Sequence, residues 1–172
     1  MISDDVFARE VRALTDTAYA VSYLILGNSA DCEDAMSETV LRAYEARGKL
    51  KKRDSFRAWF LRILRNEAYN VLRRRRRLTL VEELPEGAAP EADSAGRLDL
   101  IAALRELTED QRTALLLQQE GYSLEEISQA LDVPLGTVKS RVSRAKKTMR
   151  TLLEEEHDGK EAIYRAGRAS HT

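Results

Sequence analysis

The chain has 172 residues, of which 43% are hydrophobic and 33% are charged, and its formal net charge is −1. It has no run of about 18 apolar residues, so no membrane span is expected, and its acidic first five residues are unlike an export signal. Its single cysteine, Cys32, excludes an internal disulfide and has no Cys or His neighbour at metal-ligand spacing. The composition therefore predicts a helical protein of a reducing cytoplasm, without metal or cofactor.

Three helices are predicted in a first domain that spans residues 1–77. Apolar residues recur every three or four positions from residue 6 to 26, where a glycine ends the first helix. The second helix covers 31–47, with acidic side chains in its first turn that favour the positive end of the helix dipole. After a short basic loop at 49–53, a third helix follows and ends in five consecutive arginines.

Residues 78–97 have a different composition, with two of the three prolines, two glycines and mostly acidic or small side chains. Such a segment buries too little apolar area to offset the entropy lost on ordering, so a flexible linker is predicted.

A second domain is predicted over residues 98–153, beginning with a short amphipathic helix. Thr108 and Ser123 each stand three residues before Gln or Glu, which is the capping-box spacing that opens a helix. The second of these helices is followed by a turn at 132–134 and a last helix at 135–153. The polar tail at 154–172 is predicted to be frayed. Because no alternating strand pattern occurs, the predicted fold is all-α, with two small helical domains joined by the linker.

Charge is concentrated in two blocks of the chain. Residues 55–77 carry eight basic side chains against one acidic, and residues 134–153 carry six against none, whereas the stretch between them is acidic. This distribution indicates two separate contacts with a polyanion.

The second basic block follows a helix-turn-helix pattern. A short helix, a tight turn and a second helix with an exposed polar face are what major-groove recognition requires. The backbone at the start of that second helix can meet a phosphate, and its Arg and Lys side chains can read guanine edges or hold phosphates. The candidate DNA-binding residues are Thr137, Lys139, Ser140, Arg141, Arg144 and Lys147.

The first basic block presents one polar face of the third helix, on which residues at spacings of three and four are Arg62, Arg65, Asn66, Tyr69, Asn70 and Arg73. Asparagine can pair with bases, and a tyrosine on such a face can stack on an unpaired base. The alternative is that the five arginines are a solvated tail or a targeting patch. Trp59 is interpreted as a core residue rather than a stacking platform.

Three segments resemble the extracytoplasmic-function (ECF) sigma factors of the sigma-70 family of RNA polymerase. Residues 31–44, DCEDAMSETVLRAY, are similar to region 2.2, and residues 56–68, FRAWFLRILRNEA, to regions 2.3 and 2.4. The motifs GYSLEEI and GTVKSRVSRA at 121–127 and 136–145 are similar to region 4.2. The chain departs from the family at Ser37, where Gln is usual, and at Val40, where an aromatic residue is common.

The resemblance implies a transcription initiation factor whose partners are core RNA polymerase, promoter DNA and an anti-sigma factor. It would act in the cytoplasm, at the nucleoid or held at the membrane by the anti-sigma factor. The second domain would read the minus-35 element as duplex and contact the polymerase beta flap. The beta-prime coiled coil would be bound by Asp31, Asp34, Glu38 and Arg42. The minus-10 element would be opened and held by Lys51, Lys52, Arg53, Arg62, Asn66, Tyr69, Asn70, Arg73 and Arg74.

Two other classes of protein are weighed against this interpretation. A helix-turn-helix regulator that is not a polymerase subunit explains the second domain equally well, but not the basic, Asn-bearing helix before the linker. An enzyme is disfavoured because both histidines, His157 and His171, lie in the polar tail, and no nucleophile or phosphate-loop motif occurs.

Overall fold

The computed structural model describes residues 2–50, 56–79 and 103–169, and within these ranges the regular elements are all helices. The predicted all-α class is confirmed. Lys51, Lys52 and Arg53, the linker beyond residue 79 and the start of the helix predicted at 98–107 lie outside the described residues. None of the described helices is both long enough and apolar enough to cross a bilayer.

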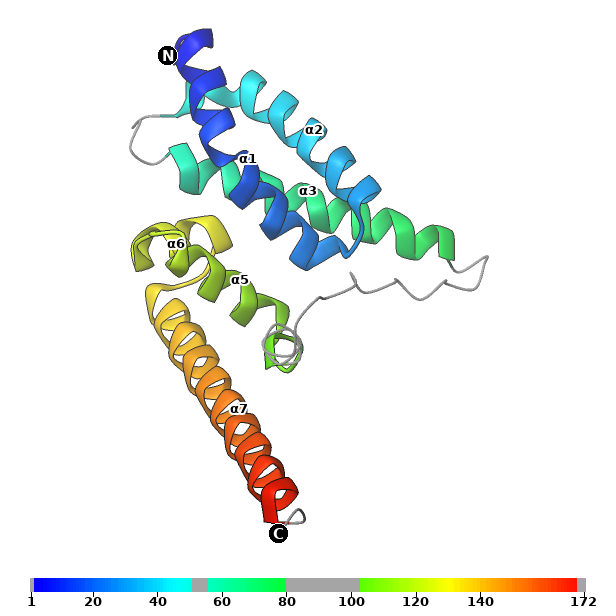
Figure 1. The fold of residues 1–172 in the computed structure, drawn as a ribbon. Helices are drawn as coiled ribbons and strands as arrows, with labels where there is room; N and C mark the ends of the chain where they lie inside the picture. Colours follow the sequence, from blue (N-terminus) through cyan, green and yellow to red (C-terminus); the bar gives the residue numbers. More distant parts are fainter. Residues whose placement is uncertain (1, 51–55, 80–102, 170–172) are drawn as a thin grey trace.

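The N-terminal domain packs three helices against one another: α1 (Asp4–Leu26), α2 (Ser29–Ala46) and α3 (Phe56–Thr79), with a 3-10 turn, η1 (Arg47–Lys49), after α2 (Figure 1). Gly27 ends α1 with a φ of 75°, a left-handed conformation that glycine adopts without a steric penalty. The buried centre of this domain is aromatic and aliphatic. It includes Phe7, Val21, Phe56, Phe60 and Leu64.

Two helix ends differ from the prediction. Helix α2 begins two residues early because Asn28 caps it: the backbone N–H of Asp31 donates to the Asn28 side chain over 2.9 Å. Helix α3 runs through the whole arginine run to Thr79, so Leu78 and Thr79 are helical rather than linker. Arginine is a good helix former, which explains why the run does not end the helix.

The C-terminal domain consists of α5 (Glu109–Gln119), α6 (Leu124–Leu131) and α7 (Leu135–Ala169). Both predicted capping boxes are present, with Thr108 paired to Gln111 and Ser123 paired to Glu126. The prediction that the last helix ends at residue 153 is wrong, because α7 continues to Ala169. Residues 154–169 are rich in Glu, Arg and Ala, which have high intrinsic helix propensity.

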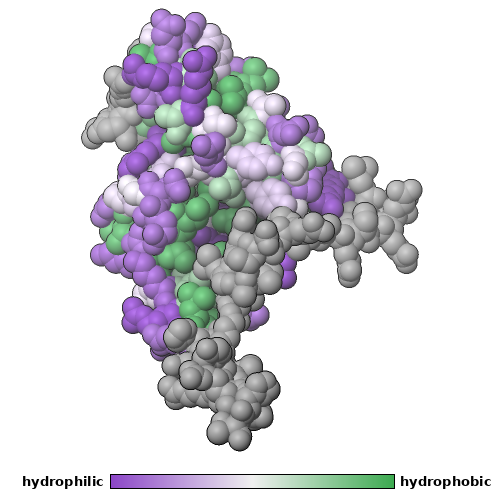
Figure 2. All heavy atoms as spheres, viewed as in Figure 1, coloured by the Kyte–Doolittle hydropathy of each residue, from purple (hydrophilic) through white to green (hydrophobic). Residues whose placement is uncertain are grey.

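The two domains lie against each other, with α6 on α3 and α5 on α1 (Figure 1). Hydrophilic side chains cover much of the face seen in Figure 2, and hydrophobic ones come to the surface near its middle, over α5 and the upper part of α7. A groove between α1, α5 and α7 opens there, with Tyr23, Leu116 and Met149 in its wall. The contact between the two domains places the acidic start of α5 over the polar face of α3.

Candidate nucleic-acid interface

The helix-turn-helix forms as its sequence pattern predicts. Ile127 and Ala130 of α6 and Val138 of α7 are almost completely buried, and together they fix how the two helices cross. The turn between them is held by Ser128, whose hydroxyl donates to the Val133 carbonyl over 2.6 Å. Asp132 takes the left-handed conformation, with a φ of 54°, that tightens this turn.

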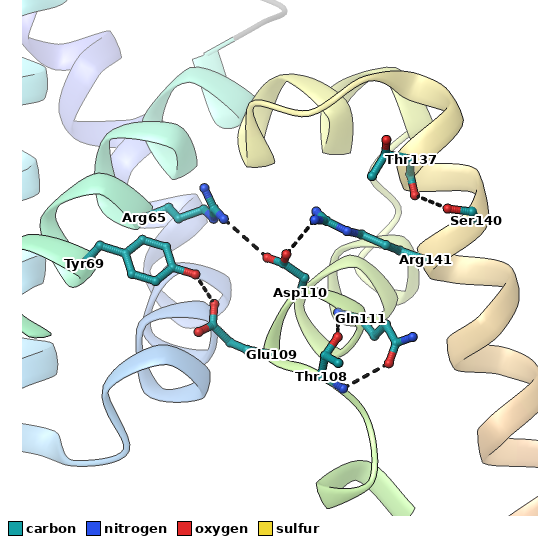
Figure 3. Close-up of polar contacts among 9 residues, drawn as sticks. All are labelled: Arg65, Tyr69, Thr108, Glu109, Asp110, Gln111, Thr137, Ser140 and Arg141. Carbon is teal, nitrogen blue, oxygen red and sulfur yellow. Dashed lines mark hydrogen bonds and ion pairs between the residues drawn. The ribbon is translucent and has the colours of Figure 1, made fainter.

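The predicted DNA-binding side chains of α7 divide into an exposed and a half-buried group. Lys139, Arg144 and Lys147 are exposed, so they are available to a duplex laid along the helix. Thr137 and Ser140 are half-buried, and the Ser140 hydroxyl donates to the Thr137 carbonyl over 2.9 Å (Figure 3). The start of the helix is open to solvent at Gly136, where nothing lies within 4 Å of an added Cβ atom.

Arg141 belongs to the second group, because its guanidinium turns back toward α5. One of its terminal nitrogens lies 2.6 Å from a carboxylate oxygen of Asp110, and only 22% of its side chain is exposed. The other carboxylate oxygen of Asp110 lies 3.3 Å from Arg65 of α3. Figure 3 shows Asp110 between the two arginines, which come from different domains.

The polar face of α3 is divided in the same way. Arg62 and Asn66 are exposed, whereas Arg65 and Tyr69 are half-buried against the start of α5. The Tyr69 hydroxyl donates to a carboxylate oxygen of Glu109 over 2.5 Å, and the Arg65 guanidinium lies 4.8 Å from the ring centre (Figure 3). Burial, then the bond to Glu109, raises the pKa of Tyr69 to about 12, so the tyrosine stays a neutral donor.

Farther along α3, Asn70 bridges two charged neighbours. Its amide donates to the Glu67 carboxylate over 3.2 Å, and its carbonyl oxygen accepts from Arg73. Arg73 and Arg74 are exposed on the last turns of the helix. Among the residues that the structure describes, the exposed part of the predicted minus-10 surface therefore consists of Arg62, Asn66 and these two arginines.

A groove of about 850 Å³ separates α2 from the end of α3. Three acidic residues predicted to bind polymerase, Asp31, Asp34 and Glu38, line it together with Arg74 and Arg75. The Asp31 carboxylate lies 3.4 Å from Arg75. The groove thus combines both signs of charge on one surface, which suits a partner that presents both as well.

Arg42, also predicted to contact polymerase, joins α2 to α3 instead of pointing only outward. It lies 2.7 Å from Glu38 on its own helix and 3.0 Å from Glu67 on α3. The hydrogen bond to Glu38, with the charge of Glu67, raises the arginine pKa. Sequence reasoning missed Glu67, which is only 3% exposed. Its place on the apolar line that Phe60, Leu64 and Val71 define on α3 was the available signal.

A second contact that sequence reasoning missed joins the domains at the start of α3. The Arg57 guanidinium donates to both carboxylate oxygens of Glu126 and also to the Gly121 carbonyl. It stacks over the buried Tyr122 ring, 4.2 Å from its centre. The bond from Arg57 lowers the pKa of Glu126, and burial raises the pKa of Tyr122 to about 12. Pairing between segments so far apart in the chain leaves no periodic signal.

Acid should weaken this contact before the helices unfold. Glu126 faces Arg57 of α3 and Tyr122 of its own domain, and its pKa lies below the ordinary 4.5 while the two domains are in contact. A lowered pKa means that the charged carboxylate stabilises this domain contact fully at pH values above the ordinary pKa. The stabilisation is lost as the pH falls through the lowered pKa. We expect the distance between the domains, measured by fluorescence energy transfer, to increase below about pH 4.5 while far-ultraviolet circular dichroism still reports helix.

The control is Glu126→Gln, which keeps the capping box but cannot titrate. Its domain separation should change less with pH than that of the unchanged chain. Identical pH profiles for the two proteins would contradict a role for Glu126.

Fold and surfaces together define a class: a two-domain helical DNA-binding protein with a helix-turn-helix in one domain and a basic helix face in the other. Models of two protein families match the chain, sigma-70 region 2 over residues 8–78 and sigma-70 region 4 over residues 97–149. The chain belongs to the sigma-70 family of RNA polymerase sigma factors, in its ECF class.

Two relatives show the extent of the match. The ECF sigma factor EcfG of Rhodopseudomonas palustris is 33% identical, over 79% of this chain and 77% of the relative. The ECF sigma factor SigE of Mycolicibacterium smegmatis is 36% identical over 83% of this chain, which spans 60% of that longer relative.

A solved structure has the same fold. The sigma factor RpoE of Bartonella quintana, crystallised with the anti-sigma factor NepR, is 28% identical and superposes with a TM-score of 0.67. The match covers 86% of this chain and 96% of that one.

Proposed function

We propose that this chain is an alternative sigma factor that binds core RNA polymerase and directs promoter-specific transcription initiation. The observation that carries the proposal is the presence, in one chain, of an exposed basic recognition helix and a second basic helix face beside an acid-lined groove. A regulator that acts alone needs only the first of these surfaces.

The minus-35 element is assigned to the exposed side of α7. Lys139 and Lys147 are exposed and would neutralise phosphates, and Arg144, also exposed, would form a bidentate contact with a guanine edge in the major groove. Thr137 and Ser140 lie at the start of the helix, where backbone N–H groups would meet a phosphate. Arg141 joins them only when it leaves Asp110.

The minus-10 element is assigned to the polar face of α3. Arg62 and Asn66 are exposed one helical turn apart, and Tyr69 and Asn70 continue the face. Extruding a base costs a few kcal/mol, so a surface that stacks on the base and hydrogen-bonds to it must offset that cost. Arg73 and Arg74, with the basic residues 51–53 of the sequence, would supply charge for the displaced strand.

Core polymerase is assigned to the groove between α2 and α3. Asp31, Asp34 and Glu38 line it and would face the beta-prime coiled coil, while the C-terminal domain would meet the beta flap. Arg42 would support this surface by holding α2 on α3 through Glu67. An anti-sigma factor is a further proposed partner, since the Bartonella quintana relative was solved with one. With these partners, the proposed place of action is the cytoplasm.

Reconstituted transcription tests this function. The chain is mixed with core polymerase and a promoter library, and transcripts are sequenced; specific start sites are expected that core alone does not produce. A double charge reversal, Asp31→Lys with Asp34→Lys, should abolish them, whereas Glu125→Lys on the exposed side of α6 should not. A chain that binds DNA but never initiates with core would be a helix-turn-helix regulator instead.

A further inference from the structure

Carboxylates of the C-terminal domain occupy part of the surface that the proposed function assigns to DNA. We propose that these contacts form an interdomain latch, consisting of Arg57–Glu126, Arg65–Asp110–Arg141 and Tyr69–Glu109, which holds the free chain closed. Closure masks DNA-binding side chains in both domains at once. This inference rests on the proposed DNA-binding role of α3 and α7.

The centre of the latch is Asp110. Its two carboxylate oxygens bind different arginines, Arg65 of α3 and Arg141 of the recognition helix, at 3.3 and 2.6 Å (Figure 3). The three side chains are between 20% and 30% exposed, so the pairs are partly shielded from water and salt. One acidic residue therefore withdraws a cation from each proposed DNA-binding surface.

Glu109, the residue before Asp110, binds Tyr69. The Tyr69 hydroxyl donates to this carboxylate, and the ring is half-buried beneath the start of α5. A base cannot stack on that ring while α5 covers it. The acidic first turn of α5 thus covers the part of α3 where nucleic acid is expected to bind. Its carboxylates contact side chains that would otherwise be available to DNA.

The second half of the latch lies at the start of α3. Arg57 binds Glu126 through two nitrogens and also binds the Gly121 carbonyl, which ties α3 to the loop before α6. A further hydrogen bond, from Thr17 of α1 to Glu120, measures 3.2 Å. Bidentate arginine–carboxylate pairs are directional as well as strong, so they fix the orientation of one domain on the other.

The latch is built so that a competing ligand can open it. Its bonds are polar and charge-assisted, whereas the buried apolar residues of the two domains belong to one hydrophobic cluster. The charged bonds are the part of the domain contact for which a charged ligand can compete. Four proposed DNA-binding side chains outside the latch remain exposed: Arg62, Asn66, Lys139 and Arg144. The closed chain can therefore still bind DNA through these side chains, but more weakly than the open chain. A partner that binds both domains at separated sites, as core polymerase does in the proposed function, would release Arg65, Tyr69 and Arg141 together.

The test compares two triple variants of the full chain that remove the same number of negative charges. The latch variant carries Glu109→Gln, Asp110→Asn and Glu126→Gln; glutamine at 126 preserves the capping box. The control variant carries Glu106→Gln, Glu125→Gln and Glu154→Gln, all at exposed positions. Circular dichroism first establishes that both variants keep the helix content of the unchanged chain.

Domain separation is the first measurement. Fluorophores are attached at Ala13→Cys and Gln129→Cys, both exposed, in a Cys32→Ser background, and energy transfer is recorded without polymerase. Transfer should fall in the latch variant and stay unchanged in the control. Equal transfer in all three proteins would overturn the inference, because the carboxylates would then not hold the domains together.

DNA affinity is the second measurement, made with a labelled 30-base-pair duplex of mixed sequence as the probe. The latch variant should bind about tenfold more tightly than the control at low salt, because the released arginines reach phosphates and each contact steepens the salt dependence. Equal affinities of the two variants would overturn the masking.

Transcription with core polymerase separates this inference from the proposed function. Both triple variants retain the surfaces assigned to promoter and polymerase, so both should initiate. If the unchanged chain itself fails to initiate, the proposed function is wrong, whereas the two measurements above address the latch alone.

Discussion

Replacing Phe60 by alanine should remove most of the stability of the N-terminal domain. Phe60 is completely buried at the centre of the three-helix core and stacks on Phe56, with ring centres 6.0 Å apart. Truncating a buried phenylalanine costs about 3–5 kcal/mol, since both transfer energy and packing around the cavity are lost. A domain of this size has a total stability of roughly 5 kcal/mol, so little would remain.

Urea denaturation measures this change directly. The chain has one tryptophan, Trp59, which lies in the same domain with its ring centre 5.6 Å from that of Phe56, so its fluorescence reports this domain. Arg62→Ala is the matched control, because Arg62 is exposed on the same helix and its truncation should change stability by less than about 0.5 kcal/mol. A midpoint for Phe60→Ala equal to that of the control would contradict the assignment of Phe60 to the core.

Features of the fold that depend on neighbouring residues were predictable from sequence. The capping boxes at Thr108 and Ser123 form because the two partners of each box are three residues apart, within the same turn. The end of α7 was not predictable in this way. The sequence beyond 153 has no apolar stripe, so periodicity did not indicate that the helix continues.

The candidate site shows where periodicity stops being informative. The helical spacing predicted that Arg62, Arg65, Asn66 and Tyr69 share one face of α3. It did not show that Asp110 binds Arg65 and that Glu109 binds Tyr69. Contacts across tens of residues depend on how the domains pack, which no local spacing encodes. The burial of Glu67 was indicated by its place on the apolar line of α3, but its pairing with Arg42 on another helix of the same domain was not.

Arg144→Ala and Arg141→Ala should have different effects, although both residues lie on the recognition helix. Arg144 is exposed, so its loss should leave the free energy of unfolding unchanged within about 0.5 kcal/mol. Binding of the polymerase complex to its minus-35 duplex should weaken by about 1–3 kcal/mol, the value of a bidentate guanine contact. Arg141 is held by Asp110, so its loss should lower the unfolding free energy by about 1–2 kcal/mol.

A promoter recovered from the transcription experiment, and the same promoter with its minus-35 guanines replaced, serve as the two probes. Arg144→Ala should abolish discrimination between them, whereas Lys147→Ala, at an exposed phosphate-contact position, should weaken both equally. If Arg144→Ala bound both probes as the unchanged chain does, Arg144 would not read bases. If Arg141→Ala lost discrimination and kept full stability, its pairing with Asp110 would contribute nothing to the fold, and Arg141 would be the base-reading arginine.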